Sequence, residues 1–190
     1  MDKAKETLKL WLPIAAVTTI LCGLAYLSVQ QDLRMSANDP QIQMAEDAAQ
    51  GLTQGAAVDT VVPTSQIDIA RSLAPFVIVF DNRGNPLASS GLLQGEIPHL
   101  PPGVLDYVRQ NGEDRITWQP QPGVRMASVV VGFSGVKSGF VLAARSLREI
   151  EKREDQAELE AGLAWIAALG VSLIVVALGA FLLGSDSRTK

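Results

Sequence analysis

The pattern of apolar and charged positions divides the chain into three parts. No charged residue falls within positions 10–31 or 161–184, and both stretches are mostly apolar, whereas charges are frequent between them. At a helical rise of about 1.5 Å per residue, each stretch can cross a hydrocarbon core of roughly 30 Å. We therefore predict two transmembrane helices, a central domain and two short ends. The predicted ranges are 1–9 (N-terminus), 10–29 (first span), 30–160 (central domain), 161–184 (second span) and 185–190 (tail).

Charges next to the apolar stretches predict the orientation of the chain. Three lysines precede the first stretch, and Arg188 and Lys190 follow the second. Since short basic flanks stay in the cytoplasm, we predict a two-pass protein of the cell membrane with both termini cytoplasmic and the central domain extracytoplasmic. The central domain contains 11 Lys or Arg and 17 Asp or Glu. This acidic balance argues against nucleic acid as a partner.

The first apolar stretch has an alternative interpretation as a cleavable signal peptide, because basic residues precede it. Its length, and the lack of a small-x-small cleavage site after Tyr26, favour a retained transmembrane helix. Aromatic residues support the retained helix. Trp11 and Tyr26 lie near opposite ends of the first stretch, and Trp165 and Phe181 lie towards opposite ends of the second, as expected of membrane-interface anchors.

The central domain alternates between helix and strand patterns. Apolar residues occupy both faces of the stretch 76–80, as in a covered strand. We predict an α+β fold in which a five-stranded antiparallel sheet carries helices on one face. Strands are predicted at residues 76–80, 86–89, 114–120, 124–133 and 139–146. Helices are predicted from Asp39 and Pro40 to Gly55, over residues 65–73, over residues 103–112, and from residue 147 into the second apolar stretch.

The residue types that most enzymes and metal sites require are scarce. Cys22, inside the first apolar stretch, is the only cysteine, and His99 is the only histidine. These counts exclude intrachain disulfides, Cys-based metal sites and multi-histidine metal sites. His99 lies in the proline-rich stretch EIPHLPPG and is interpreted as a surface or packing residue. We therefore expect no enzyme activity, no metal site and no cofactor.

The string DNRGN, residues 81–85, has two interpretations. Alternating oxygen-bearing side chains are typical of calcium loops, but the bidentate glutamate that ends such loops is missing. Gly84 and Asn85 tolerate positive φ, which a tight turn between strands requires. We predict a turn that joins strands 76–80 and 86–89.

Several stretches together resemble a known sensor family. These stretches are DPQIQMAEDAA, VIVFDNRGNPLASSG, PPGVLDYVRQNGE, ITWQPQPGVRMASVVV and GFVLAARSL, and they lie between the two apolar stretches. Their order is similar to that in the extracytoplasmic PAS-like (Cache/PDC-type) sensor region of bacterial histidine kinases and chemoreceptors. The resemblance covers about residues 30–160 and implies a PAS-like fold with a ligand pocket over the sheet. In that family, ligand binding shifts the last helix and so switches a cytoplasmic signalling domain.

The resemblance places a ligand pocket between the sheet and residues 92–112. Planar guanidinium groups bind carboxylates through two hydrogen bonds, so a small organic anion is the expected ligand. Alternatively, the arginines near this pocket are solvated or paired with neighbouring acids, and Trp118 packs in the core or at an edge of the sheet. The candidate ligand-binding residues are Tyr107, Arg109, Trp118, Arg125 and Arg145.

The chain departs from the family after Gly184, where SDSRTK follows. We therefore expect a sensor without an output domain, which detects a small ligand or a state of the cell envelope and acts through a partner membrane protein. Small residues spaced four apart, such as Thr19 and Gly23 or Ala164 and Ala168, also predict a homodimer. The alternative function is a non-sensing scaffold or assembly subunit of an envelope complex.

Overall fold

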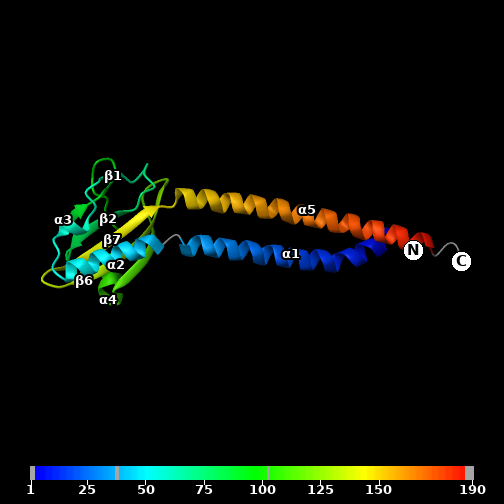
Figure 1. Cartoon of the computed structure of the whole chain (residues 1–190), viewed down its shortest axis with the longest axis horizontal. Coiled ribbons are helices and arrows are strands. Elements are labelled where there is room, and N and C mark those ends of the chain that lie inside the picture. Colours follow the sequence, from blue (N-terminus) through cyan, green and yellow to red (C-terminus); the bar gives the residue numbers. More distant parts are fainter. Residues whose placement is uncertain (1–2, 37–38, 102, 187–190) are drawn as a thin grey trace. The chain divides into compact units, whose positions relative to one another are not determined.

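The computed structural model describes residues 3–36, 39–101 and 103–186 (Figure 1). The chain divides into two compact units. Residues 1–33 and 153–190 form the helical unit, and residues 34–152 form the sheet unit. The predicted tail residues Arg188 and Lys190 lie outside the described residues, and so does the side chain of Asp39.

Two long helices make up the helical unit. Helix α1 spans Lys3–Ser36, and helix α5 spans Arg148–Asp186, of which the part from Arg153 belongs to this unit. Each helix contains a stretch long and apolar enough to cross a membrane, and the most apolar part of each stretch is not buried. The two predicted spans are therefore confirmed as helices of suitable length and composition.

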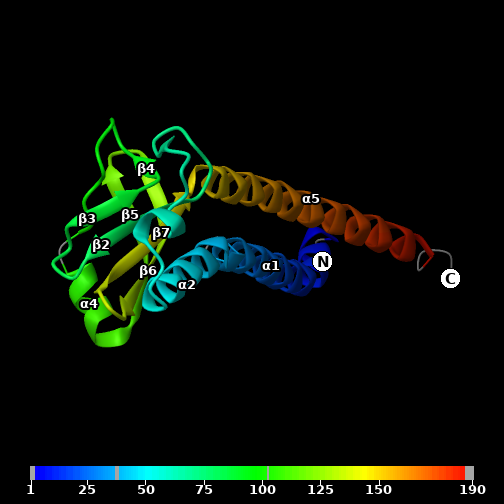
Figure 2. The same ribbon diagram turned by 60° about the vertical axis from the view of Figure 1, so that its left-hand side comes forward.

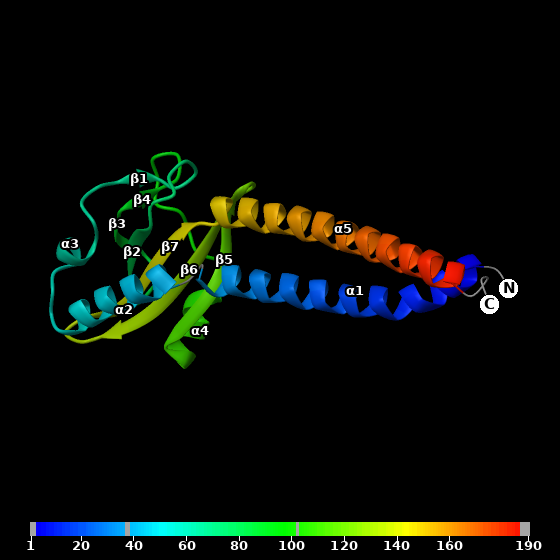
Figure 3. The same cartoon turned by 45° about the vertical axis from the view of Figure 1, so that its right-hand side comes forward.

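Side-chain hydrogen bonds connect α1 and α5 within the helical unit. Trp11 Nε1 donates to Ser172 Oγ over 2.9 Å, and Trp165 Nε1 donates to Thr19 Oγ1 over 3.0 Å. The partners of Trp11 and Thr19 follow in reverse order along α5, so the two helices are antiparallel. They lie side by side in Figures 1 and 3. Trp11 and Trp165, predicted as interface anchors, thus also connect the two helices.

The sheet unit contains a five-stranded antiparallel sheet, as predicted. Its strands lie in the order β3-β2-β7-β6-β5, and every neighbouring pair is antiparallel. Figure 2 shows the sheet from another side, and β7 is the central strand of the order. The strands are β2 (Phe76–Asp81), β3 (Pro86–Ser89), β5 (Glu113–Gln121), β6 (Val124–Ser134) and β7 (Ser138–Ser146).

Helices cover both faces of the sheet. Helix α2 (Asp39–Thr53) packs its alanine-rich side on β6 and β7, on the face that also carries the odd-numbered valines of β2. Helix α4 (Val104–Asn111) packs Val108 on the other face, against the even-numbered side chains of β2. The prediction that helices cover one face is therefore wrong. Both faces are covered because both faces of β2 are apolar. Helices on one face alone would leave half of the apolar side chains of β2 in water.

The helix predicted over residues 65–73 is wrong. Instead, strand β1 (Ile67–Asp68) pairs in parallel with β4 (Gly91–Leu92), and a turn follows it. The backbone amides of Ile67 and Ile69 donate to carbonyls of Ser90 and Leu92, and the Ile69 side chain is buried in the core. Long-range pairing and burial therefore override the local helical pattern. A short helix, α3 (Val58–Val61), lies between α2 and β1.

The first turn of α5 belongs to the sheet unit and is hydrogen-bonded to the rest of it. Leu147 N donates to Arg125 O over 2.9 Å, and the Arg125 guanidinium forms an ion pair with Glu151. Arg148 Nη2 donates to Arg71 O over 3.0 Å. Strand β7 ends at Ser146 and α5 begins at Arg148. A single residue therefore separates the central strand from the helix that contains the second apolar stretch.

Candidate functional site

A surface hollow of about 300 Å³ lies where the β2–β3 turn meets α4 and the residues that precede it. We call it the arginine hollow. Its apolar part includes Phe80, Leu100 and Leu105. Its ionisable groups are Arg83, His99, Asp106 and Arg109.

The β2–β3 turn forms one wall of the arginine hollow and is held by Asp81. The Asp81 carboxylate accepts hydrogen bonds from Arg83 N, Asn85 N and Asn85 Nδ2, each over 2.8 Å. These donors, the Asn85 side chain above all, lower the pKa of Asp81 below its ordinary value of 3.8. Gly84 has a φ of 88°, and a Cβ there would lie 2.8 Å from Leu105 Cδ1 of α4. The predicted turn is therefore confirmed, and its glycine permits close contact with α4.

Arg109 of α4 is fixed by three contacts. Its Nη1 forms an ion pair with Asp106, three residues earlier, and its Nη2 donates to Asn82 O of the turn over 2.7 Å. The guanidinium also lies over the ring of Phe140 in β7, with Cζ 5.0 Å from the ring centroid. A side chain already held in place loses less entropy when it binds a ligand. Arg109 therefore connects α4, the turn and the central strand at the edge of an open hollow.

Positive charge exceeds negative charge among the residues that line the arginine hollow. Arg83 and Arg109 provide two positive charges against one carboxylate, Asp106, and the exposed His99 ring adds a further hydrogen-bonding group. Neither Arg83 nor His99 is predicted as a site residue from the sequence. An arginine inside a tight turn carries no local sign of a pocket, because its position depends on the packing of the turn against α4.

The structure places one of the five predicted ligand-binding residues, Arg109, in the arginine hollow. Trp118 is 2% exposed and belongs to the core, and Tyr107 is 52% exposed on α4. Arg125 is engaged with the first turn of α5, and Arg145 lies near the end of β7. The structure therefore does not bring these five side chains together in one pocket.

Side chains fill the space between the sheet and α4, which is one part of the region between the sheet and residues 92–112 where the resemblance implies a ligand pocket. Phe76, Phe80, Val108 and Leu142 are members of this apolar cluster, and each is at most 2% exposed. Another hollow, of about 520 Å³, lies at the surface between residues 93–99 and the β5–β6 turn. Among the described residues, no group of three or more His, Cys, Asp or Glu side chains could hold a metal ion.

No protein-family model, no curated protein and no solved structure matches the chain. The likeness to PAS-like sensors therefore stays a prediction from the order of the elements. The established features are an α+β sheet unit with a five-stranded antiparallel sheet, and two flanking helices long and apolar enough to span a membrane.

Proposed function

We propose that the chain is a two-pass membrane protein whose sheet unit is an extracytoplasmic, PAS-like sensor domain for a small anion. The observation that carries this proposal is the position of Arg109. Its guanidinium lines an open hollow and at the same time rests on Phe140 of the central strand. The domain acts through a partner protein in the same membrane.

The chemistry of the arginine hollow supports an anionic ligand. Asp106 and Asn82 O occupy part of the Arg109 donor set, and the remaining N–H groups have no hydrogen-bond partner among the described residues and can meet a carboxylate or phosphate. Arg83 from the turn and His99 lie on the same hollow and add donors from other directions. A small anion would thus be held by side chains from three separate segments.

The central strand supports a route from the hollow to the second apolar stretch. Phe140, under the Arg109 guanidinium, is the third residue of β7, and α5 begins one residue after β7 ends. Strand β7 is hydrogen-bonded on both sides, to β2 and β6. A ligand that binds one position of this strand more tightly, by a few kcal/mol, shifts the population towards it.

The filled core favours a second function. A scaffold or assembly subunit needs no internal ligand pocket, and the apolar cluster between the sheet and α4 is continuous from Phe76 to Val108 and Trp118. In that case the arginine hollow is a surface feature of a domain that binds another protein. The ligand experiment separates the two functions.

Thermal unfolding of the full-length protein in detergent micelles tests the sensor function. Acetate, succinate and inorganic phosphate are added separately at constant ionic strength. We expect at least one of them to raise Tm in a concentration-dependent way, because a ligand that binds only the folded state stabilises it. Arg109→Gln should remove the shift.

Arg115→Gln is the matched control. Arg115, on β5, is also a partly exposed arginine in an ion pair, with Glu113, but it lies outside the arginine hollow. This variant should keep the anion-induced rise in Tm. Loss of the shift in both variants would show nonspecific anion binding, and no shift with any of the three anions would favour the scaffold.

A further inference from the structure

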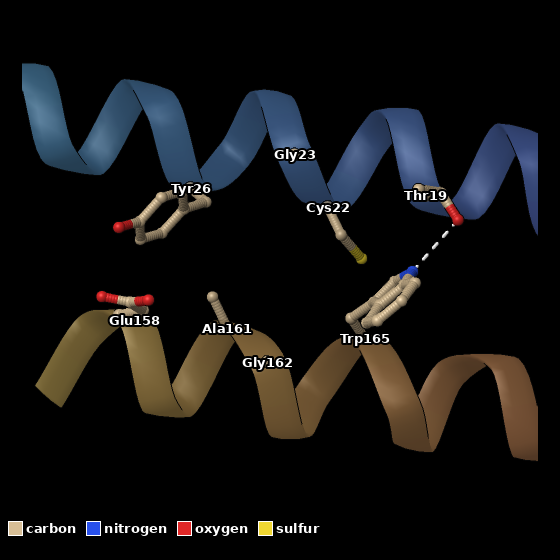
Figure 4. Close-up of a pocket in the computed structure, with 8 residues that line it drawn as sticks. All are labelled: Thr19, Cys22, Gly23, Tyr26, Glu158, Ala161, Gly162 and Trp165. Carbon is tan, nitrogen blue, oxygen red and sulfur yellow. Dashed lines mark hydrogen bonds between the residues drawn. The ribbon is translucent and has the colours of Figure 1, made fainter. Parts of the chain in front are cut away.

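A hollow of about 230 Å³ lies between α1 and α5 in the helical unit. Figure 4 shows the residues that line it. The Tyr26 ring and the Glu158 carboxylate point towards each other at one end, and Trp165, hydrogen-bonded to Thr19, closes the other. The Cys22 side chain points into the space between them. We call the surface around this hollow the glycine face, because a glycine from each helix lies at its centre.

The contact between α1 and α5 does not require these two glycines. They are Gly23 and Gly162, and a Cβ added to either would find no heavy atom within 4 Å. Glycine is a weak helix former, so both residues weaken their helices without improving the contact between them. In membranes, small residues allow another helix to approach closely. At this hollow the two glycines therefore leave the backbone of both helices open to a helix from outside the pair.

Glu158 gives the glycine face a negative charge at one end. It lies three residues before the apolar stretch that begins at Ala161, so it falls at the edge of the predicted span. The chain has no Lys, Arg or His between Lys9 and Arg34, and none between Arg153 and Arg188. A cation that complements Glu158 at this depth must therefore come from another molecule.

A second copy of the chain does not provide this cation. Packed in the same orientation and at the same depth, it would bring its own Glu158 and Glu160 towards the acidic end of the hollow. Like charges placed opposite each other across an interface disfavour the pairing. The charge pattern thus argues against this face as a homodimer contact.

A lipid with an amine headgroup could offer a cation, but it fits the centre of the hollow less well. An acyl chain gains nothing from exposed backbone. A helix that approaches Gly23 and Gly162 gains close backbone packing and Cα–H···O contacts. The open backbone at Gly23 and Gly162 therefore favours a helix over a lipid, and a helix with a basic side chain also complements the charge of Glu158.

We propose that the glycine face binds a transmembrane helix of a different protein, with small residues opposite Gly23 and Gly162 and a Lys or Arg opposite Glu158. This inference rests on the proposed function in one respect, since both require a partner in the same membrane. It adds the chemistry by which that partner is recognised. It does not depend on the anion ligand.

Disulfide trapping at Cys22 tests the proposal. The full-length chain is reconstituted in phosphatidylcholine vesicles with a synthetic Leu/Ala transmembrane peptide of about 20 residues. The peptide carries two glycines four positions apart, one cysteine on the same side, and a lysine at one end. A mild added oxidant then converts the Cys22 and peptide thiols to a disulfide. We expect about tenfold more disulfide with this peptide than with one carrying glutamate in place of lysine.

Matched variants of the chain locate the contact. Glu158→Gln should remove the preference for the lysine peptide, whereas Glu160→Gln, which changes a neighbouring carboxylate outside this hollow, should keep it. Gly162→Leu should block trapping by filling the hollow. Gly170→Leu should not, because Gly170 also has open space around it but does not line the hollow.

Four results would overturn the proposal. These are equal trapping of the two peptides, trapping that survives Gly162→Leu, a predominance of Cys22–Cys22 disulfides between copies, and loss of trapping when phosphatidylethanolamine replaces half of the lipid. The third would assign the face to a second copy, and the fourth to a lipid. No anion is present in this experiment, so its failure leaves the Arg109 test unaffected, and failure of the Arg109 test leaves this one unaffected.

Discussion

The helical unit and the sheet unit contain the same kinds of apolar side chain in opposite surroundings. In the helical unit, Leu10 is 62% and Ile174 is 59% exposed, whereas Ile78 and Leu142 of the sheet unit are fully buried. Proteins in water seldom leave such long apolar surfaces uncovered. The sheet unit thus provides its own core, whereas the two helices of the helical unit are long and apolar enough to span a membrane and leave these side chains uncovered. The hydropathy of a residue alone does not show whether its side chain is buried in a core or exposed on a long apolar helix.

The largest expected effect tests this contrast directly. Leu142→Ala should destabilise the sheet unit by about 2–5 kcal/mol, because it leaves a cavity in a packed core. Leu178→Ala removes the same atoms from a side chain that is 57% exposed on α5, and should change the stability of the sheet unit by less than about 0.5 kcal/mol. Thermal unfolding of the full-length protein in micelles, followed by circular dichroism of the sheet, measures both. Equal destabilisation would show that the two units do not differ in this way.

A polar side chain in the sheet unit provides the next test. Gln41 on α2 is fully buried, and neither its Nε2 nor its Oε1 has a hydrogen-bond partner among the described residues. Burying polar groups without partners costs free energy, so Gln41→Met should raise stability by about 1–3 kcal/mol. Gln43→Met, on the exposed side of the same helix, is the control and should have little effect. A lower Tm for Gln41→Met would mean that an ordered water or another group satisfies this amide.

Patterns that repeat along the chain were sufficient to predict most of the fold. The uncharged stretches predicted both long helices, and the unbroken apolar run of β2 predicted a covered strand. The failures involve partners far away in sequence. Residues 65–73 look helical in isolation, but Ile67 and Ile69 form backbone hydrogen bonds with Ser90 and Leu92. The apolar residues on both faces of β2 imply cover on both faces, but which helix packs on which face depends on tertiary packing, and the prediction of one covered face is wrong for that reason.

The candidate site was harder to predict than the fold for the same reason. Arg109 could be found because it lies on a short helix next to the predicted pocket. Residue type left Trp118 between ligand contact and packing in the core or at an edge, and the structure buries it in the core, where it pairs with Met126 in the sheet register. Arg83 lines the hollow from a turn in which the neighbouring Gly84 packs closely against Leu105. Such contacts depend on register and turn geometry, which residue type alone does not specify.

The smallest expected effect is a pH-dependent change in the stability of the sheet unit that the helical unit should not share. The pKa of Asp81 is lowered below 3.8 because its carboxylate accepts three hydrogen bonds in the folded turn. A lowered folded-state pKa contributes stability above the unfolded value of 3.8, and this contribution is lost as pH falls through the folded value. Asp81→Asn should therefore lower the Tm of the sheet unit near neutral pH, by a few degrees, and the difference in Tm from wild type should shrink below pH 3.8.

Asp59→Asn, which removes an exposed carboxylate from α3, controls for the loss of one surface charge. A Tm difference for Asp81→Asn that stays constant down to pH 2.5 would show that the turn does not depend on the carboxylate charge, and helix content from α1 and α5 should not follow this profile.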